Sequence, residues 1–211
     1  VLETAWEALE SAGVDPATAE GDGGVYVGCS MADYASRAGE LADEQLTPHL
    51  GAGLAPSAIP GRLSHFLGWH GPSMTVDTAC SSSLVTLHLA ASALRAGECS
   101  VALAGGVNLM HHPRNHIIFS RAGMLSPDGR CRTFDHHADG YGRSEGCGIL
   151  VLKRLSDARA AGDTVLAVLT GSAVRQDGAS GGLTVPNGLA QADVMRRALA
   201  AAGLTAEDVS Y

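Results

Sequence analysis

Aromatic residues are scarce in this sequence: Phe, Trp and Tyr make up 4% of its 211 residues. Any core is therefore built mainly from Ala, Val and Leu, and 45% hydrophobic residues are enough to form one. No apolar run approaches the roughly 20 residues of a membrane-spanning helix. Basic residues are also few, with 14 Lys and Arg against 22 Asp and Glu, and they form no tract. The net charge of −8 disfavours nonspecific nucleic-acid binding, so we expect neither nucleic acid nor a membrane as a partner.

Cysteines number only five, and no Cys-x-x-Cys pair occurs among them. The odd count and the spacing disfavour both a zinc site and a secreted disulfide framework. The first residues, "VLETAWEALESAG", form a helical pattern and lack the charged start and apolar run of a signal peptide. We therefore expect reduced thiols in a cytoplasmic protein. A chain that opens within a helical pattern and without Met is expected to be a piece of a longer polypeptide.

Continuous apolar segments alternate with helical patterns along the chain. Such segments predict strands buried on both faces, as in a parallel or mixed sheet, so the expected fold class is α/β. The segment 111–145 is long and irregular, which is typical of a functional loop. The expected strands are 23–30, 73–77, 100–110, 146–155 and 164–175, with another opening at 208–211. The expected helices are 1–12, 56–68, 81–95, 156–162 and 189–202.

Cys80 lies in the stretch "VDTACSSSLVTLHLAASALRAG", between an expected strand and an expected helix. A helix N-terminus carries partial positive charge and free N–H groups, which favour a thiolate and can hold an oxyanion. The order of strand, nucleophile and helix parallels the elbow of hydrolases, and the small Ala79 and Ser81 leave room for a sharp turn. From these residues alone, a nucleophile and a buried thiol both stay open for Cys80. The helix is expected to bury Leu84, Leu87, Ala91 and Leu94.

The other thiols and the histidines are predicted to be neither a nucleophile, a catalytic base nor a metal site. His88 lies about 12 Å along the helix from Cys80, too far to act as its base. The adjacent pairs 111–112 and 136–137 would point to opposite faces of an extended chain, so no metal site is predicted. Glu145 is expected to make structural hydrogen bonds. Cys29, Cys99 and Cys147 are expected to be small buried hydrophobes. Cys131, in a polar loop, has no predicted role.

Four segments of the chain, taken together, resemble the β-ketoacyl synthases, most closely the ketosynthase domain of modular type I polyketide synthases. The longest, "GPSMTVDTACSSSLVTLHLAASALRAGECSVALAGGVNLM", places Cys80 at the position of the family's nucleophilic cysteine. The others follow the family's order: "ETAWEALESAG", "FSRAGMLSPDGRCRTFDHHADGYGRSEGCGILVLKRLSDA" and "GSAVRQDGASGGLTVPNGLAQ". The family typically has small residues where His136 and His137 fall. The resemblance covers nearly the whole chain and implies that Cys80 accepts the acyl group.

The resemblance implies the thiolase-like fold, in which two similar α/β halves stack as five layers, αβαβα, and the protein is a dimer. Residues 1–211 would then be a partial ketosynthase domain, with 1–160 as most of the first half and 161–211 as the start of the second. Phe119 aligns with a residue that packs beside the acyl pocket, so it is a candidate for substrate binding as well as for core packing. The family's two catalytic histidines and its lysine would follow Tyr211, so the fragment is expected not to complete condensation.

The implied reaction has two stages. An acyl chain moves from a carrier-protein thioester to Cys80, and a decarboxylated malonyl-type extender then attacks it as a carbanion. The implied partners are an acyl carrier protein, the acyl and malonyl-type thioesters, a second copy of the chain and neighbouring synthase domains. No cofactor is expected to bind directly, because phosphopantetheine is carried by the acyl carrier protein.

Three alternatives stay open. A fatty-acid synthase condensing enzyme shares the chemistry, although "DTACSSSLV" and "DGASGGLTVPNG" favour the polyketide type. A non-elongating ketosynthase-like domain would keep Cys80 and only bind or transfer acyl chains. A cysteine hydrolase with the same elbow would need a His and an acid around Cys80, and would hydrolyse thioesters without forming a carbon–carbon bond.

Overall fold

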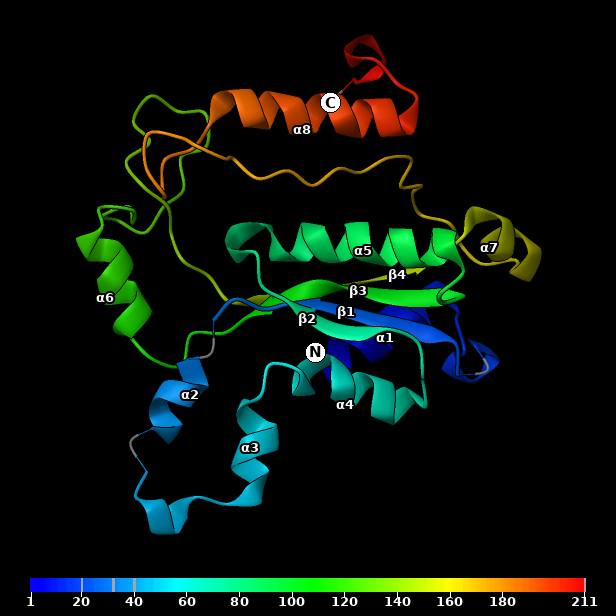
Figure 1. The fold of residues 1–211 in the computed structure, drawn as a ribbon, viewed down its shortest axis with the longest axis horizontal. Helices are drawn as coiled ribbons and strands as arrows, with labels where there is room; N and C mark the ends of the chain where they lie inside the picture. Colours follow the sequence, from blue (N-terminus) through cyan, green and yellow to red (C-terminus); the bar gives the residue numbers. More distant parts are fainter. Residues whose placement is uncertain (20, 32, 40, 211) are drawn as a thin grey trace.

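The computed structural model describes residues 1–19, 21–31, 33–39 and 41–210, and it has helices on both faces of a sheet (Figure 1). This arrangement confirms the predicted α/β class. The strands are β1 (Gly23–Gly28), β2 (Ser73–Val76), β3 (Val101–Asn108) and β4 (Gly146–Lys153). The helices are α1 (Leu2–Ala12), α2 (Asp33–Ala38), α3 (Pro48–Leu54), α4 (Ala58–Leu67), α5 (Ser82–Ala96), α6 (Arg114–Arg121), α7 (Leu155–Ala161) and α8 (Gly188–Ala202).

The described strands form one sheet in the order β2-β1-β3-β4. β1 is parallel to both of its neighbours, and Val25 lies opposite Ser73 on one side and Leu103 on the other. β4 is antiparallel to β3, with Val151 opposite Leu103. Because β1, β2 and β3 are parallel, their carboxyl ends meet at one edge of the sheet, where ligand and catalytic sites of α/β proteins commonly lie.

Side-chain alternation along β1 divides the core between the two faces of the sheet. Val25 and Val27 are fully buried in a cluster with Leu9 of α1 and Leu63 of α4. Tyr26 faces α5, and burial raises the pKa of its hydroxyl to about 12. The residues around Tyr26 include small ones, which let α5 approach the sheet closely: Ala90, Ala93, Ala102 and Ala104.

The buried face of α5 differs from the predicted leucine face. Leu84 is 69% exposed, whereas Ser82, Thr86 and Ala90 are buried against the sheet. The predicted burial of Ala91 and of the leucine near the helix end is confirmed. Small and hydroxyl-bearing residues replace leucine at the start of the helix because the helix lies too close to the strands there to fit a large side chain.

Residues 164–175 do not form the predicted strand. They run extended along α5, but within the described chain no strand pairs with them, and Leu166 is 90% exposed. A strand requires a neighbour that accepts its backbone hydrogen bonds, and an apolar pattern cannot supply one. The segment contacts helices on two sides: Ser172 Oγ lies 2.8 Å from His88 Nδ1 of α5, and a Cβ at Gly171 would lie 2.6 Å from Ala198 O of α8.

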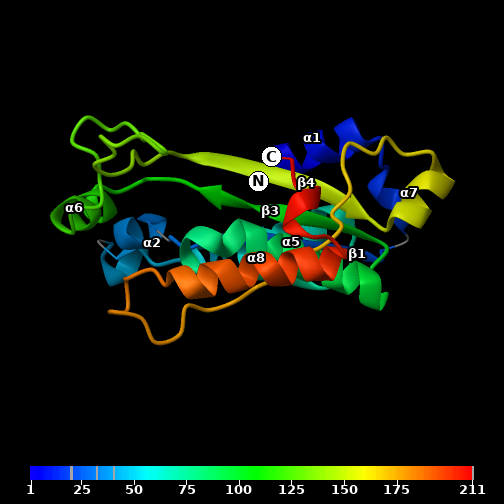
Figure 2. The same ribbon diagram turned by 90° about the horizontal axis from the view of Figure 1, so that it is seen from above.

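The layers therefore follow one another as α1 and α4, the sheet, α5, residues 164–175 and α8 (Figure 1). Seen from above, α8 runs along α5 (Figure 2). The predicted strand opening at 208–211 is wrong for the described part, which has the 3-10 turn Ala206–Asp208, and Tyr211 lies outside the described residues. No helix in the described part of the chain is long and apolar enough to span a membrane.

Candidate functional site

Cys80 lies in a sharp turn between β2 and α5, as the sequence predicts. The 3-10 turn Ala79–Ser81 leads from the strand into the helix, which begins at Ser82. Ala79 has a φ of +52°, in the left-handed region that costs a non-glycine residue roughly 1 kcal/mol or more. A strained turn of this kind persists only where the surrounding structure holds it, and such turns cluster at functional sites.

Side chains on both sides of the cysteine hold this turn. Asp77 Oδ1 accepts a hydrogen bond from Ala79 N–H at 3.0 Å. Ser82 Oγ accepts from Thr78 N–H at 2.9 Å and donates to Ala79 O at 2.7 Å. Ser81 Oγ donates to Thr78 O at 2.8 Å. Two of the serines that follow the cysteine in the sequence therefore satisfy backbone groups of the turn and fix its shape.

The first turn of α5 packs closely on the carboxyl ends of β1 and β3. A Cβ at Gly28 would lie 2.8 Å from Ser83 N, and a Cβ at Gly106 would lie 3.0 Å from Ser83 Cβ. One turn later, the fully buried Thr86 donates a hydrogen bond to Gly105 O at 3.0 Å. Glycines on the strands and small side chains on the helix thus set the position of the helix N-terminus.

Cys80 is exposed, so this structure contradicts its reading as an ordinary buried thiol. It precedes a 15-residue helix, whose dipole favours an anion at this end. The other thiols behave as predicted or nearly so: Cys99 is 1% exposed, while Cys29 and Cys147 are half-buried. The turn therefore presents an accessible thiol at the N-terminal end of a long helix.

We predict that Cys80 is alkylated by iodoacetamide at neutral pH at least about tenfold faster than Cys99. Burial raises the pKa of the Cys99 thiol, so less of it is thiolate, and its 1% exposure also blocks the reagent. Quantitative peptide mass spectrometry after timed alkylation of the folded protein measures both rates. Equal rates at the two cysteines would contradict the interpretation of Cys80 as an accessible, reactive thiol.

The remaining predicted residues occupy three different environments. Phe119, on α6, is half-buried, with the guanidinium of Arg143 5.1 Å from its ring centre. α6 lies on the side of the molecule toward which the N-terminal end of α5 points (Figure 1). Glu145 has the structural role predicted for it, since Oε1 accepts a hydrogen bond from Met110 N–H. His88 contacts Ser172 of the extended segment.

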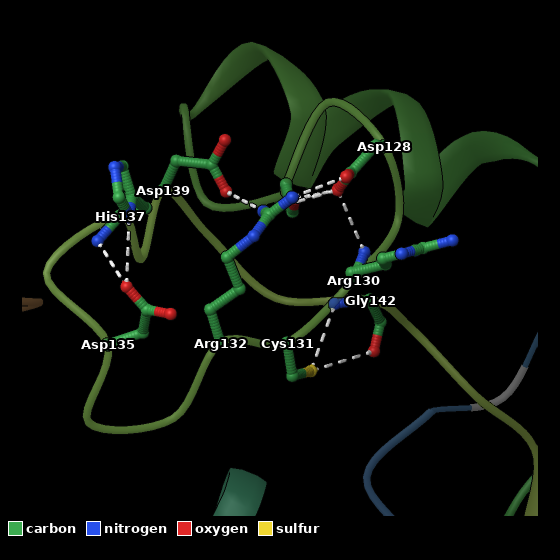
Figure 3. Close-up of polar contacts among 9 residues, drawn as sticks. Asp128, Arg130, Cys131, Arg132, Asp135, His137, Asp139 and Gly142 are labelled. Carbon is green, nitrogen blue, oxygen red and sulfur yellow. Dashed lines mark hydrogen bonds and ion pairs between the residues drawn. The ribbon is translucent and has the colours of Figure 1, made fainter.

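The segment that follows α6 closes on itself, since Leu125 and Tyr141 form an isolated bridge. Inside this loop, Arg132 forms ion pairs with Asp128 and, at 3.1 Å, with Asp139 (Figure 3). One guanidinium therefore joins two carboxylates on opposite arms of the loop. The predicted irregularity of 111–145 is confirmed outside α6, but the loop is held by specific contacts.

The prediction that His136 and His137 point to opposite faces is wrong. They lie in a turn rather than in a strand, and their ring centres are 3.7 Å apart. Together with Asp135 they form a group whose donor atoms could hold a metal ion, all within 4.8 Å of one another. The sequence does contain a signal for this group, namely a run of three potential metal ligands in a polar loop. The prediction missed it because it assumed an extended backbone, in which adjacent side chains point to opposite faces.

Comparison with known proteins gave matches along nearly the whole chain. The family model for the β-ketoacyl synthase N-terminal domain matches residues 1–158, and that for the C-terminal domain matches residues 166–211. Polyketide synthase GfsA of Streptomyces halstedii is 57% identical over 210 residues, which is 99% of this chain and 3% of that protein. Erythronolide synthase EryA3 of Saccharopolyspora erythraea is 54% identical over 212 residues, 100% of this chain and 7% of that protein.

Solved structures with the same fold include two ketosynthases. The oxazolomycin ketosynthase domain OzmH KS7 of Streptomyces albus JA3453 matches with a TM-score of 0.88 and 41% identity, over 100% of this chain and 37% of that one. The ketosynthase from module 6 of the bacillaene synthase of Bacillus subtilis 168 has a TM-score of 0.89 and 39% identity, over 100% of this chain and 35% of that one. The chain thus spans about a third of these solved chains and a small part of the curated synthases.

Proposed function

Because this chain belongs to the β-ketoacyl synthase family, we propose that it accepts an acyl chain on Cys80 during polyketide chain extension. Family membership confirms the predicted resemblance, and the solved ketosynthases confirm the thiolase-like fold. The polyketide class follows from relatives named as polyketide and erythronolide synthases. One observation carries the assignment of the residue: Cys80 is an exposed thiol next to a strained, tightly held turn at the start of α5.

The proposed first step transfers an acyl group from a carrier-protein thioester. The Cys80 thiolate attacks the thioester carbonyl, the carbon–sulfur bond to the carrier breaks, and the carrier leaves as a thiol after taking up a proton. The carbonyl oxygen becomes an anion during the attack, and the positive end of α5 stabilises it. Because Cys80 is exposed, it is accessible to a substrate that is attached to a carrier protein.

The proposed second step forms the carbon–carbon bond. A malonyl-type thioester loses carbon dioxide, and the resulting carbanion attacks the acyl carbonyl on Cys80. The Cys80 thiolate is released, and the β-ketoacyl thioester stays on the carrier. We assign none of the described histidines to this step; His88, the one that lies on the same helix, contacts Ser172.

The partners of the reaction are proposed on the same basis. We propose an acyl carrier protein that bears phosphopantetheine, neighbouring synthase domains, a second copy of the chain in a dimer, and a cytoplasmic setting. We also propose that residues 1–160 belong to the first half of the thiolase-like fold and 161–211 to the second; the two family models meet near this boundary. Phe119 is proposed to line the acyl pocket, supported by its half-buried position on α6.

The test uses the full-length protein incubated with acyl-carrier thioesters of several chain lengths. We expect the peptide that contains Cys80 to gain the mass of the acyl group, and the peptides with the other four cysteines to stay unmodified. A Cys80 peptide without added mass at every chain length would contradict the proposal.

The same reaction mixture separates the alternatives. Adding a malonyl-carrier thioester to the acylated protein should release the acyl group from Cys80 as a lengthened β-ketoacyl thioester. Acylation without lengthening would identify a non-elongating domain, and free carboxylic acid without lengthening would identify a hydrolase.

A further inference from the structure

The turn that contains Asp135, His136 and His137 brings together three side chains of the types that bind metal ions. Asp135 N–H donates to Arg132 O at 3.1 Å, and Ala138 N–H donates to Asp135 O at 3.1 Å, so hydrogen bonds define the backbone on both sides. His137 N–H donates to Asp135 Oδ1 at 2.8 Å, which orients the carboxylate. The three side chains therefore converge, with one donor atom from each within 4.8 Å of the others (Figure 3 shows Asp135 and His137).

Two of the distances between donor atoms match those around a tetrahedral metal ion. Asp135 Oδ1 lies 3.2 Å from His137 Nδ1 and 3.4 Å from His136 Nδ1. Zinc bonds of 2.0–2.1 Å at tetrahedral angles place neighbouring ligand atoms about 3.3 Å apart. One ligand atom from each of the three residues lies within 4.8 Å of the other two, so small rotations of the rings would bring them to a triangle of zinc ligands.

The loop around the turn gives these residues a fixed base. Arg132 joins Asp128 and Asp139, which flank the turn on either side in the sequence (Figure 3). The Arg132 guanidinium is thereby paired with these two carboxylates, and the Asp135 carboxylate interacts with the histidines instead. Side-chain exposures of 48%, 84% and 70% for Asp135, His136 and His137 leave the donor atoms open to an ion from solution.

We propose that Asp135, His136 and His137 form a binding site for Zn²⁺, with water in the fourth position. Two imidazoles and one carboxylate are the ligand types of three-ligand zinc sites, whereas magnesium and calcium prefer oxygen ligands alone. The site shares no residue with the Cys80 turn, and its existence does not depend on the proposed acyl transfer. Its expected effect is to cross-link the turn and hold the loop from 125 to 141 more rigidly.

Histidine modification by diethyl pyrocarbonate tests the site residue by residue. The full-length protein is treated with the reagent at increasing Zn²⁺ concentrations, and peptide mass spectrometry measures carbethoxylation of His136 and His137. We expect Zn²⁺ to protect both rings, since the metal occupies one ring nitrogen and the other carries a proton, which leaves no free lone pair for the reagent. The readout is local, so Zn²⁺ bound to thiols elsewhere does not affect it.

Two variants and one control identify the ligands. Asp135→Asn and His137→Ala should each raise the Zn²⁺ concentration that half-protects His136 by about tenfold or more. His49→Ala, which removes an exposed histidine of α3, should leave that concentration unchanged. All three substituted side chains are exposed, so the variants keep the core intact. Modification of His136 and His137 that is unaffected by millimolar Zn²⁺, or protection that survives in both variants, would overturn the proposal.

Discussion

In the Cys80→Ala variant, formation of the acyl-enzyme is expected to fall at least about 10³-fold, to the level of the background reaction. The substitution removes the only atom that can form the thioester at this position, and the helix dipole cannot replace a nucleophile. The thermal midpoint of unfolding should stay within a few degrees of the wild-type value, because Cys80 is exposed and its removal leaves no cavity. Radiolabelled acyl transfer and thermal unfolding, measured on the same preparation, give both values.

Cys131→Ala is the matched control, because Cys131 is the other exposed thiol. It lies in the loop after α6, where its Sγ accepts a hydrogen bond from Gly142 N–H at 3.3 Å (Figure 3). We expect this variant to be acylated at the wild-type rate. A Cys80→Ala protein that is still acylated, or a Cys131→Ala protein that is not, would place the nucleophile elsewhere.

Substitution of Gly28 by alanine is expected to lower both the stability and the acylation rate. The new Cβ would lie 2.8 Å from the backbone at Ser82 and Ser83, so α5 must move away from β1. Overpacking of this kind costs about 3 kcal/mol in the free energy of unfolding. The displacement carries the Cys80 turn with it, and a shift of about 1 Å can lower a rate roughly 10²-fold. Urea unfolding and the acyl-transfer assay measure the two effects separately.

Gly61→Ala provides the comparison for this prediction. Gly61 lies inside α4, and a Cβ there would meet no atom within 4 Å. We expect this variant to gain about 0.5–1 kcal/mol in the free energy of unfolding, because alanine loses less backbone entropy in a helix than glycine does. If Gly28→Ala behaved like Gly61→Ala, the close contact between β1 and α5 would not be what positions Cys80.

Several features of the site could be predicted from local sequence. The apolar run before Cys80 and the helical pattern after it predicted a strand, a turn and a helix, and the structure has all three. The serines after Cys80 indicated a tight turn but not their roles. Ser82 Oγ bonds to groups at Thr78 and Ala79, and only the folded turn brings these together.

The face that α5 buries against the sheet could not be predicted from local sequence. Leucine spacing placed Leu84 in the core, yet it is 69% exposed, and Thr86 is buried in the first half of the helix instead. The reason is the distance between helix and sheet. Gly28 and Gly106 allow such a close approach that only small side chains fit between them. Hydrophobic periodicity records which residues are apolar, but not how much room the partner surface leaves.

The sequence by itself determined the family, the α/β class, the order of most strands and helices, and Cys80 as the candidate nucleophile. These depend on motifs and on local patterns of neighbouring residues. Tertiary structure decided three other points: that 164–175 has no pairing strand within the described chain, that α5 buries its small side chains, and that His136 and His137 lie side by side. The first two points depend on contacts with backbone or side chains that are distant in sequence, and the third depends on a turn whose geometry such contacts hold. A local sequence pattern contains no information about these contacts.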